Sequence, residues 1–335
     1  MKQLLKLSVA SFLIAGALAV QASTLSDVQS KGHVSCGVSK GLAGFSAADS
    51  SGTWTGVDVD VCRAVAAATL GDATKVKFVP LTAKERFTAL QSGEIDMLSR
   101  NTTWTITRDA SLGLNFAGVN YYDGQGFMVK SSLGVSSALE LGGAAVCIQA
   151  GTTTELNLAD WGKSNGIDYQ SVVSDTNAQT LTNYDSGRCD VLTTDASGLY
   201  SMRAASNDPS EHVVLPEIIS KEPLGPVVRQ GDDQWFNIVR WSLNAMITAE
   251  ELGVTSATVD EVTNNPERER LMGRSGNTHE YVGLTPDWTY NIISQVGNYS
   301  ESFERNIGLN TPIGIARGVN ALWTDGGILY SPPFR

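Results

Sequence analysis

The chain has 335 residues, of which 42% are hydrophobic and 18% are charged, and its formal net charge at pH 7 is −11. This is the composition of a globular protein that is long enough for two packed lobes. The acidic charge argues against a nucleic-acid-binding protein, because such a protein would carry a basic surface.

Residues 1–22 have the three parts of a cleavable export signal peptide. Lys2 and Lys6 precede an apolar stretch at 7–20, and small residues end at Ala22. That stretch is shorter than the about 20 residues that a membrane-spanning helix needs. We expect cleavage after Ala22 and a soluble exported protein.

Two similar units of alternating strands and helices follow. Hydrophobic runs and helical spacing predict a first unit with strands at 33–38, 75–81 and 94–99 and helices at 56–71 and 83–93. They predict a second unit with strands at 143–150, 169–174 and 189–195, a helix opened by 151–155 and a helix at 178–188. This alternation is typical of an α/β fold with parallel sheets covered by helices.

The remainder of the chain is less regular. A segment at 224–234 carries Gly, Pro and charge, and 235–252 is predicted to form a long helix. Residues 255–335 contain loops and a short amphipathic stretch. The four cysteines Cys36, Cys62, Cys147 and Cys189 form no CxxC motif, and in an exported protein they are expected to form two disulfides by one of three pairings.

The sequence GVSKG at 37–41 has the spacing of a hydrolase nucleophile elbow around Ser39. In an elbow the helix begins directly after the serine, whereas here a loop rich in Gly and Ser continues to Thr55. The three histidines, His33, His212 and His279, are scattered and form no triad or metal motif. We expect no catalytic serine and no metal site, although the loop leaves the end of a strand where α/β proteins bind ligands.

The stretch SRNTTWTITRD at 99–109 follows a predicted strand and carries Thr103 and Thr105 ahead of Arg108. A guanidinium binds a carboxylate through two parallel hydrogen bonds, and hydroxyls can complete the shell of the carboxylate oxygens. The alternative for Arg108 is a surface arginine after a Thr-rich turn.

The second unit offers complementary groups. Thr153 begins a helix whose free N–H groups favour an anion, unless the threonines there only cap the helix. Asp195 ends a strand and could receive an ammonium group, or it could cap the next helix. Together these groups match an α-amino acid, with its carboxylate at Arg108 and Thr153 and its ammonium at Asp195.

Several segments of the chain resemble those of a known protein family. GVDVDVCRAVA at 56–66 resembles the signature of the polar amino-acid family of solute-binding proteins of bacterial ABC importers. The stretches at 270–308 and 321–335 are similar to the subgroup of general L-amino-acid and glutamate/glutamine/aspartate/asparagine-binding proteins. The resemblance therefore covers nearly the whole mature chain.

The resemblance implies a two-lobed periplasmic-binding-protein fold of type II, with two crossing hinge strands and a C-terminal extension. Lobe 1 would comprise 23–124 and 225–335, and lobe 2 would comprise 125–224, with the crossings near GQGFMV and LGPVV. The lobes would close on the ligand by a hinge motion.

The resemblance also assigns roles to residues. Arg108 looks like the arginine that clamps the carboxylate, and Thr103 like the ligand-binding hydroxyl five residues before it. Asn101 matches a position that contacts the amine or carboxylate. Thr153 matches the second-lobe anion contact, and Asp195 looks like the aspartate that binds the ammonium.

Three further residues concern the ligand's side chain. Ser39 lies at a position that is often acidic in relatives with a narrow preference, so its neutrality predicts a broad range of ligands or acceptance of acidic side chains. Arg86 is a candidate for binding the end of the ligand's side chain, although a solvated arginine on the surface of a helix is the favoured interpretation. Trp104 walls the pocket or belongs to the core.

The resemblance implies capture rather than catalysis, with no cofactor. The partners would be a free L-amino acid and the membrane permease of an ABC importer, and the chain would be a monomer. The alternatives are a dehydratase-like periplasmic enzyme on the same fold, with Asp195 or Glu155 as its acid or base, and a sensory module. Pairing within each α/β unit predicts the disulfides Cys36–Cys62 and Cys147–Cys189.

Overall fold

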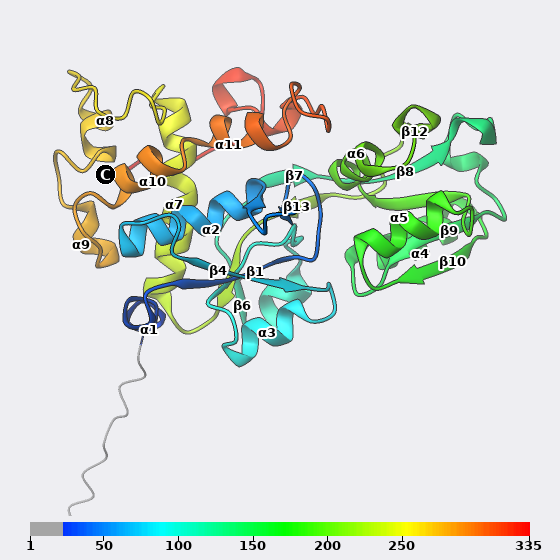
Figure 1. Cartoon of the computed structure of the whole chain (residues 1–335), viewed down its shortest axis with the longest axis horizontal. Coiled ribbons are helices and arrows are strands. Elements are labelled where there is room, and N and C mark those ends of the chain that lie inside the picture. Colours follow the sequence, from blue (N-terminus) through cyan, green and yellow to red (C-terminus); the bar gives the residue numbers. More distant parts are fainter. Residues whose placement is uncertain (1–22) are drawn as a thin grey trace, which may run out of the picture.

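The computed structural model describes residues 23–335, so the predicted signal peptide lies outside the described residues. Figure 1 shows an elongated molecule with two α/β lobes side by side, joined by a narrow pair of strands. Among residues 23–335, no helix combines the length and apolar character needed to span a bilayer.

The first lobe is built on a five-stranded sheet in the order β4-β1-β5-β14-β6. Strand β1 runs parallel to β4 and β5, whereas β14 is antiparallel to β5 and β6. The three strands predicted from the alternating pattern are therefore parallel as expected, and the antiparallel β14 adds to them as the chain returns from the second lobe. The strands are β1 (Val34–Ser39), β4 (Val76–Leu81), β5 (Met97–Leu98), β6 (Leu114–Phe116) and β14 (Val227–Arg229), and the helices are α1 (Thr24–Lys31), α2 (Val57–Leu70), α3 (Arg86–Ser92) and α7 (Asp233–Glu251).

The second lobe repeats this plan with a sheet in the order β10-β9-β11-β8-β12. Here β9 is parallel to β10 and β11, and β8 is antiparallel to β11 and β12. The strands are β8 (Gln125–Lys130), β9 (Ala145–Gln149), β10 (Gln170–Ser174), β11 (Val191–Asp195) and β12 (His212–Val214), and the helices are α4 (Thr153–Asn165), α5 (Asn177–Asp185) and α6 (Ala196–Ala205).

Two short strands connect the lobes. Strands β7 (Tyr121–Asp123) and β13 (Glu222–Leu224) form a separate antiparallel pair, next in the chain to the two predicted crossing segments. A second small pair, β2 (Ala47–Ala48) and β3 (Trp54–Thr55), lies in the loop after β1. The lobe boundaries at 124/125 and 224/225 stay a prediction.

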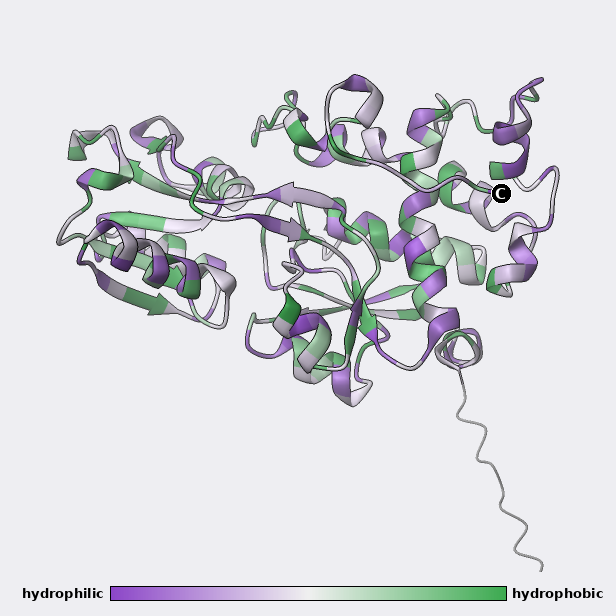
Figure 2. Cartoon of the chain, turned by 180° about the vertical axis from the view of Figure 1, so that it is seen from behind, coloured by the Kyte–Doolittle hydropathy of each residue, from purple (hydrophilic) through white to green (hydrophobic). Residues whose placement is uncertain are grey.

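The distribution of apolar residues explains why these segments form sheets and helices. Strands β1 and β8 are almost wholly buried, as expected for central strands covered on both faces. Helix α2 buries its apolar residues against the sheet and ends where Gly71 adopts a left-handed conformation (φ 70°). Figure 2 shows apolar residues along the strands of both lobes and more polar residues on the helices.

The C-terminal extension packs on the first lobe. Its helices are α8 (Pro266–Leu271), α9 (Thr278–Val282), α10 (Trp288–Gln295) and α11 (Tyr299–Asn306). Ile292 and Phe303 share one buried core with Val61 of α2 and Leu243 of α7. The extension and the first lobe therefore fold around a common core.

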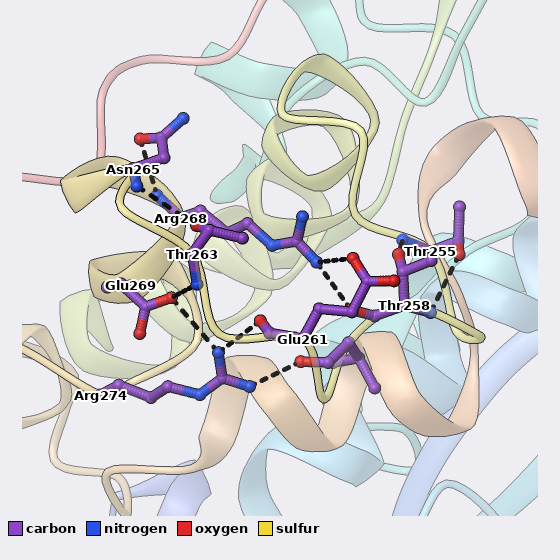
Figure 3. A network of polar contacts seen from close by, with 9 residues as sticks. Thr255, Thr258, Glu261, Thr263, Asn265, Arg268, Glu269 and Arg274 are labelled. Carbon is purple, nitrogen blue, oxygen red and sulfur yellow. Dashed lines mark hydrogen bonds and ion pairs between the residues drawn. The ribbon is translucent and has the colours of Figure 1, made fainter.

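Polar contacts fix the extension as well. Asp60 is buried at the start of α2 and accepts hydrogen bonds from Ser302, Arg305 and Asn306 at 2.6, 2.7 and 2.8 Å. A second network ties the loop before α8 to the loop after it (Figure 3), where Arg274 binds Glu269 and the carbonyl of Glu261. These bonds give order to a region that has few regular elements.

Both predicted disulfides are confirmed. Cys36 is bonded to Cys62, and Cys147 is bonded to Cys189. Each bond joins a central strand to a nearby segment of the same lobe.

Candidate functional site

The loop after β5 carries three of the predicted site residues. Asn101 has φ 34° and is the one non-glycine residue of the described chain in the left-handed region, where Asn is tolerated better than most side chains. Its backbone N–H donates to Asp58 Oδ2 at 2.7 Å. Its side-chain Nδ2 donates to Asp195 Oδ2 of the second lobe at 3.3 Å.

Asp58 organises this loop. It is buried at the start of α2 and accepts hydrogen bonds from Ser99 Oγ, the Asn101 N–H and Asn120 Nδ2. Burial raises the pKa of Asp58, and these three hydrogen bonds oppose that rise. The function of Asp58 as a support of this loop was not predicted from the sequence.

Arg108 lies in a short turn that ends the same stretch. Its guanidinium is buried, donates from Nη1 to the carbonyl of Thr103 at 2.9 Å and lies 5.2 Å from the centre of the Phe87 ring. Burial lowers the pKa of Arg108, and the carboxylates of Glu222 and Asp195 oppose the shift. Arg108 is therefore a buried cation at the junction of the lobes and not a surface arginine.

Two more arginines lie beside it. Arg86 is only 2% exposed, which contradicts the interpretation of a solvated helix arginine, because the first turn of α3 faces the interior. Its Nη1 lies 3.4 Å from Thr102 Oγ1, and its buried Nε has no partner within residues 23–335. Burial and the positive charges of Arg108 and Arg100 lower the pKa of Arg86. Burial also lowers the pKa of Arg100 to about 10.

The second lobe contributes Thr153 and Asp195. Thr153 is the first residue of α4, and the capping function belongs to Thr152, whose side chain accepts from the N–H of Glu155. Asp195 ends β11 and is 6% exposed. Within the described residues its side chain makes no capping hydrogen bond to α6, and Asp123 of β7 accepts the N–H and hydroxyl of Ser197 instead.

The connecting strands add two carboxylates that the sequence analysis missed. Glu222 and Asp123 stand directly opposite each other on β13 and β7. Glu222 is 1% exposed and accepts hydrogen bonds from Thr103 and Thr153. One sequence signal could have identified Glu222, which lies two residues before the predicted crossing segment LGPVV. A residue on a strand that joins the lobes lies at the base of their junction.

These acids influence one another. Burial, together with the charges of Asp123 and Glu222, raises the pKa of Asp195, and the hydrogen bond from Asn101 opposes the rise. Burial raises the pKa of Asp123 to about 6. The junction therefore has an acidic side on the connecting strands and β11, and a basic side at Arg86, Arg100 and Arg108.

The structure joins Asn101 to Asp195 by a hydrogen bond across the junction and places Thr103 Oγ1 3.3 Å from Thr153 Oγ1. Arg108 donates to the Thr103 carbonyl on the same side of the junction. Ser39 ends β1 and is buried, and its N–H donates to Ser46 Oγ. The next long helix begins only at Val57, which is inconsistent with a nucleophile elbow. Trp104 is 39% exposed and stacks on Phe116 with ring centres 5.5 Å apart.

Comparison with known proteins identifies the class to which this protein belongs. Residues 34–258 match the family described as bacterial extracellular solute-binding proteins, family 3, and the chain belongs to this family. Its fold is that of a two-lobed, type II periplasmic binding protein.

Individual relatives are closely similar. The chain is 61% identical to the general L-amino acid-binding periplasmic protein AapJ of Rhizobium johnstonii over 97% of each chain. It is 56% identical to the glutamate/glutamine/aspartate/asparagine-binding protein BztA of Rhodobacter capsulatus over 96% of each chain. A periplasmic binding protein of Brucella ovis, solved with glutathione bound, is 57% identical and superimposes with a TM-score of 0.92 over 94% of this chain and 100% of that one.

Proposed function

We propose that the protein captures a free L-amino acid between its two lobes and delivers it to the membrane permease of an ABC importer. The observation that carries this proposal is the pair of buried charges Arg108 and Asp195, which come from different lobes and have mainly neutral hydrogen-bond partners. Burying a charge is costly unless an opposite charge compensates it. An amino-acid zwitterion supplies both opposite charges at once.

The predicted contacts follow this polarity. The α-carboxylate would bind the Arg108 guanidinium through two hydrogen bonds and the backbone N–H groups at the start of α4, where Thr153 lies. The ammonium would bind Asp195, beside Asn101 and Thr103. Ser39 would lie in the wall of the side-chain pocket.

The part of the site that would hold the ligand's side chain favours polar and acidic ligands. Arg86 and Arg100 are buried close to Arg108, and their positive charges reinforce one another. A side-chain carboxylate or amide would provide acceptors for donors such as the buried Nε of Arg86. The names of the relatives AapJ and BztA support a range of L-amino acids that includes acidic ones and their amides.

A γ-glutamyl peptide is a second candidate ligand. The Brucella ovis relative was solved with glutathione, whose γ-glutamyl group keeps the free α-ammonium and α-carboxylate of an amino acid. The same pair of buried charges would bind that group, provided that the rest of the peptide can extend out of the junction.

Ligand binding would stabilise the closed arrangement of the lobes. The lobes already touch through Asn101–Asp195, through Thr103–Thr153 at 3.3 Å and through an exposed ion pair between Lys84 and Asp175 at 2.8 Å. A ligand that contacts both lobes shifts the population toward this arrangement by its differential affinity. The permease would then recognise the closed protein.

An exported enzyme would convert its ligand to a product, and a sensory module would bind a partner other than a permease. The relatives are named as binding proteins, which supports capture without turnover. We propose that the protein is exported to the periplasm and acts as a monomer, which cell fractionation and light scattering would test.

A thermal-shift panel of the common L-amino acids and glutathione tests the function. A ligand at one hundred times its Kd stabilises the folded protein by about 2.7 kcal/mol, so true ligands raise the Tm by several degrees. Chromatography of the same mixtures after incubation should show each ligand unchanged. A lack of stabilisation by every compound, or product at catalytic rates, would contradict the proposal.

A further inference from the structure

Glu222 holds an unusual position for a carboxylate. It is 1% exposed, and within residues 23–335 its four hydrogen-bond donors are all uncharged side chains. Oε2 accepts from Thr103 Oγ1 at 2.5 Å and from Thr153 Oγ1 at 2.9 Å. Oε1 accepts from Asn157 Nδ2 at 2.6 Å and from Ser220 Oγ at 2.7 Å.

These contacts determine what the two threonine hydroxyls can do. A hydroxyl has a single proton to donate and two lone pairs with which to accept. Both hydroxyls donate to the Glu222 carboxylate, so the protons of Thr103 and Thr153 both point to Glu222. No proton is then left for a hydrogen bond between the two hydroxyl oxygens, which lie 3.3 Å apart. Neither hydroxyl can donate to a ligand carboxylate, but each keeps lone pairs for a donor.

We infer that Glu222 is a positioning residue for the ligand's ammonium group, because it takes the protons of the Thr103 and Thr153 hydroxyls and leaves their lone pairs free to accept. This inference rests on the proposed function. It changes the expected contribution of the Thr103 hydroxyl, which was predicted to complete the shell of the ligand's carboxylate. The carboxylate is left to Arg108 and the N–H groups at the start of α4.

The charges around Glu222 fit this assignment. Glu222 stands opposite Asp123 on the connecting strands, and both carboxylates act on Asp195. Like charges placed directly opposite in a strand pair are destabilising, so cations nearby stabilise this arrangement. Glu222 already interacts with the positive charges of Arg86 and Arg108, and the ligand's ammonium would add a cation beside Asp195 and the two hydroxyls.

The position of Glu222 also links the ammonium site to closure. Thr103 comes from the first lobe, Thr153 and Asn157 come from the second, and Glu222 lies on the strand that joins them. The two hydroxyls can share one carboxylate oxygen only when the lobes are together. The acceptor pair therefore forms as the lobes close.

The test compares L-glutamate with glutarate, which has both carboxylates but lacks the ammonium. Glu222→Gln has the same shape, but its neutral amide presents only one acceptor oxygen in place of two. We expect L-glutamate affinity to fall by about tenfold or more, since hydrogen bonds to charged groups are involved, while glutarate affinity, measured by displacement, changes less than about threefold. Glu217→Gln, on the preceding segment and bonded to Ser137 and Ala138, is the matched control and should leave both affinities unchanged.

A double-mutant cycle separates positioning from a general structural effect. In a Thr103→Val background the hydroxyl is absent, so Glu222→Gln should lose a large part of its effect on L-glutamate. Equal losses for L-glutamate and glutarate, no loss for either, or the same effect in both backgrounds would overturn the inference. If Glu222→Gln does not fold, Thr103→Val alone must show the selective loss of L-glutamate. Failure of the wild-type protein to bind any amino acid would instead contradict the proposed function.

Discussion

Asn101 and Asp195 lie 94 residues apart in the chain, on different lobes, and are joined by a hydrogen bond of 3.3 Å from Asn101 Nδ2 to Asp195 Oδ2. The backbone of Asn101 is held in turn by Asp58 at the start of α2. A buried acid of the first lobe thus fixes the residue that reaches the buried acid of the second. Opening the lobes breaks this contact, so the site is complete only when they are together.

Arg108→Ala should remove a large part of the affinity for every amino-acid ligand. Truncating one partner of a buried charge pair costs about 2–5 kcal/mol, which includes the penalty of leaving the other charge unpaired. Isothermal titration calorimetry would measure the loss. Arg203→Ala, at the end of α6, serves as a control that should bind normally. Unchanged affinity in Arg108→Ala would refute the carboxylate assignment.

The affinity for amino acids should fall as the pH is lowered. In the free protein, burial and the charges of Asp123 and Glu222 raise the pKa of Asp195, while Arg86 opposes this rise. The ligand's ammonium favours the ionised carboxylate, so binding releases a proton and weakens as the pH drops through that raised pKa. Calorimetry at a series of pH values downward from neutral would measure this dependence. Asp195→Asn should bind weakly with a flatter pH profile, and an equally steep profile in that variant would contradict the assignment.

The stability of the free protein should increase as the pH is lowered, whereas the affinity for amino acids should decrease. Burial raises the pKa of Asp123 from 3.8 to about 6, so the folded state binds more protons than the unfolded state between these values. The contribution of this group to stability is therefore largest below its unfolded pKa and is lost as the pH rises through about 6. Urea unfolding of wild type and Asp123→Asn across this range would measure it, and equal pH slopes for the two proteins would disagree with the account.

Each disulfide should contribute substantially to stability. The bonds Cys36–Cys62 and Cys147–Cys189 close loops of 26 and 42 residues. By the chain-entropy relation, their loss should lower the free energy of unfolding by about 3.5 and about 4 kcal/mol. Double Cys→Ser variants of each pair, compared by urea denaturation, would show the effect. A loss below about 1 kcal/mol in both variants would contradict this expectation.

The C-terminal extension should stabilise the connecting strand β7. Asn320 accepts from the N–H of Tyr122 at 2.7 Å and donates to its carbonyl at 3.0 Å, as a neighbouring strand would. Asn320→Ala should lower the free energy of unfolding by about 1–3 kcal/mol and speed amide exchange at Tyr122. Exposed Asn310→Ala is the control. Unchanged exchange at Tyr122 would show that the extension does not support the strand.

Much of the fold could be predicted from local patterns. The strands and helices of both α/β units lie within a few residues of their predicted places, because periodicity is a local property of the sequence. The antiparallel β14 was missed because it joins the first sheet only after the chain has crossed to the second lobe and returned. Helices α8 to α11 were missed because each is at most eight residues long, which is too short for helical periodicity to stand out in the sequence.

The candidate site, too, could be predicted only where the signal is local in the sequence. Arg108, Asp195 and Thr153 follow strands or begin helices at a predictable sheet edge, so their types and positions suggested a site. The burial of Arg86 and the contacts of Asp58 depend on packing between segments far apart in the chain. Glu222 lies on a three-residue strand that pairs with another three-residue strand, and elements this short leave little pattern in the sequence.

A crystal structure of the protein with the L-amino acid that raises its Tm most would test the central claim most directly. We predict that the ligand's α-carboxylate lies against the Arg108 guanidinium and the start of α4. Its ammonium should lie within hydrogen-bonding distance of Asp195 and of Thr103 Oγ1, with Glu222 behind the hydroxyl. A ligand bound in the reverse orientation, or outside the junction of the two lobes, would contradict the account.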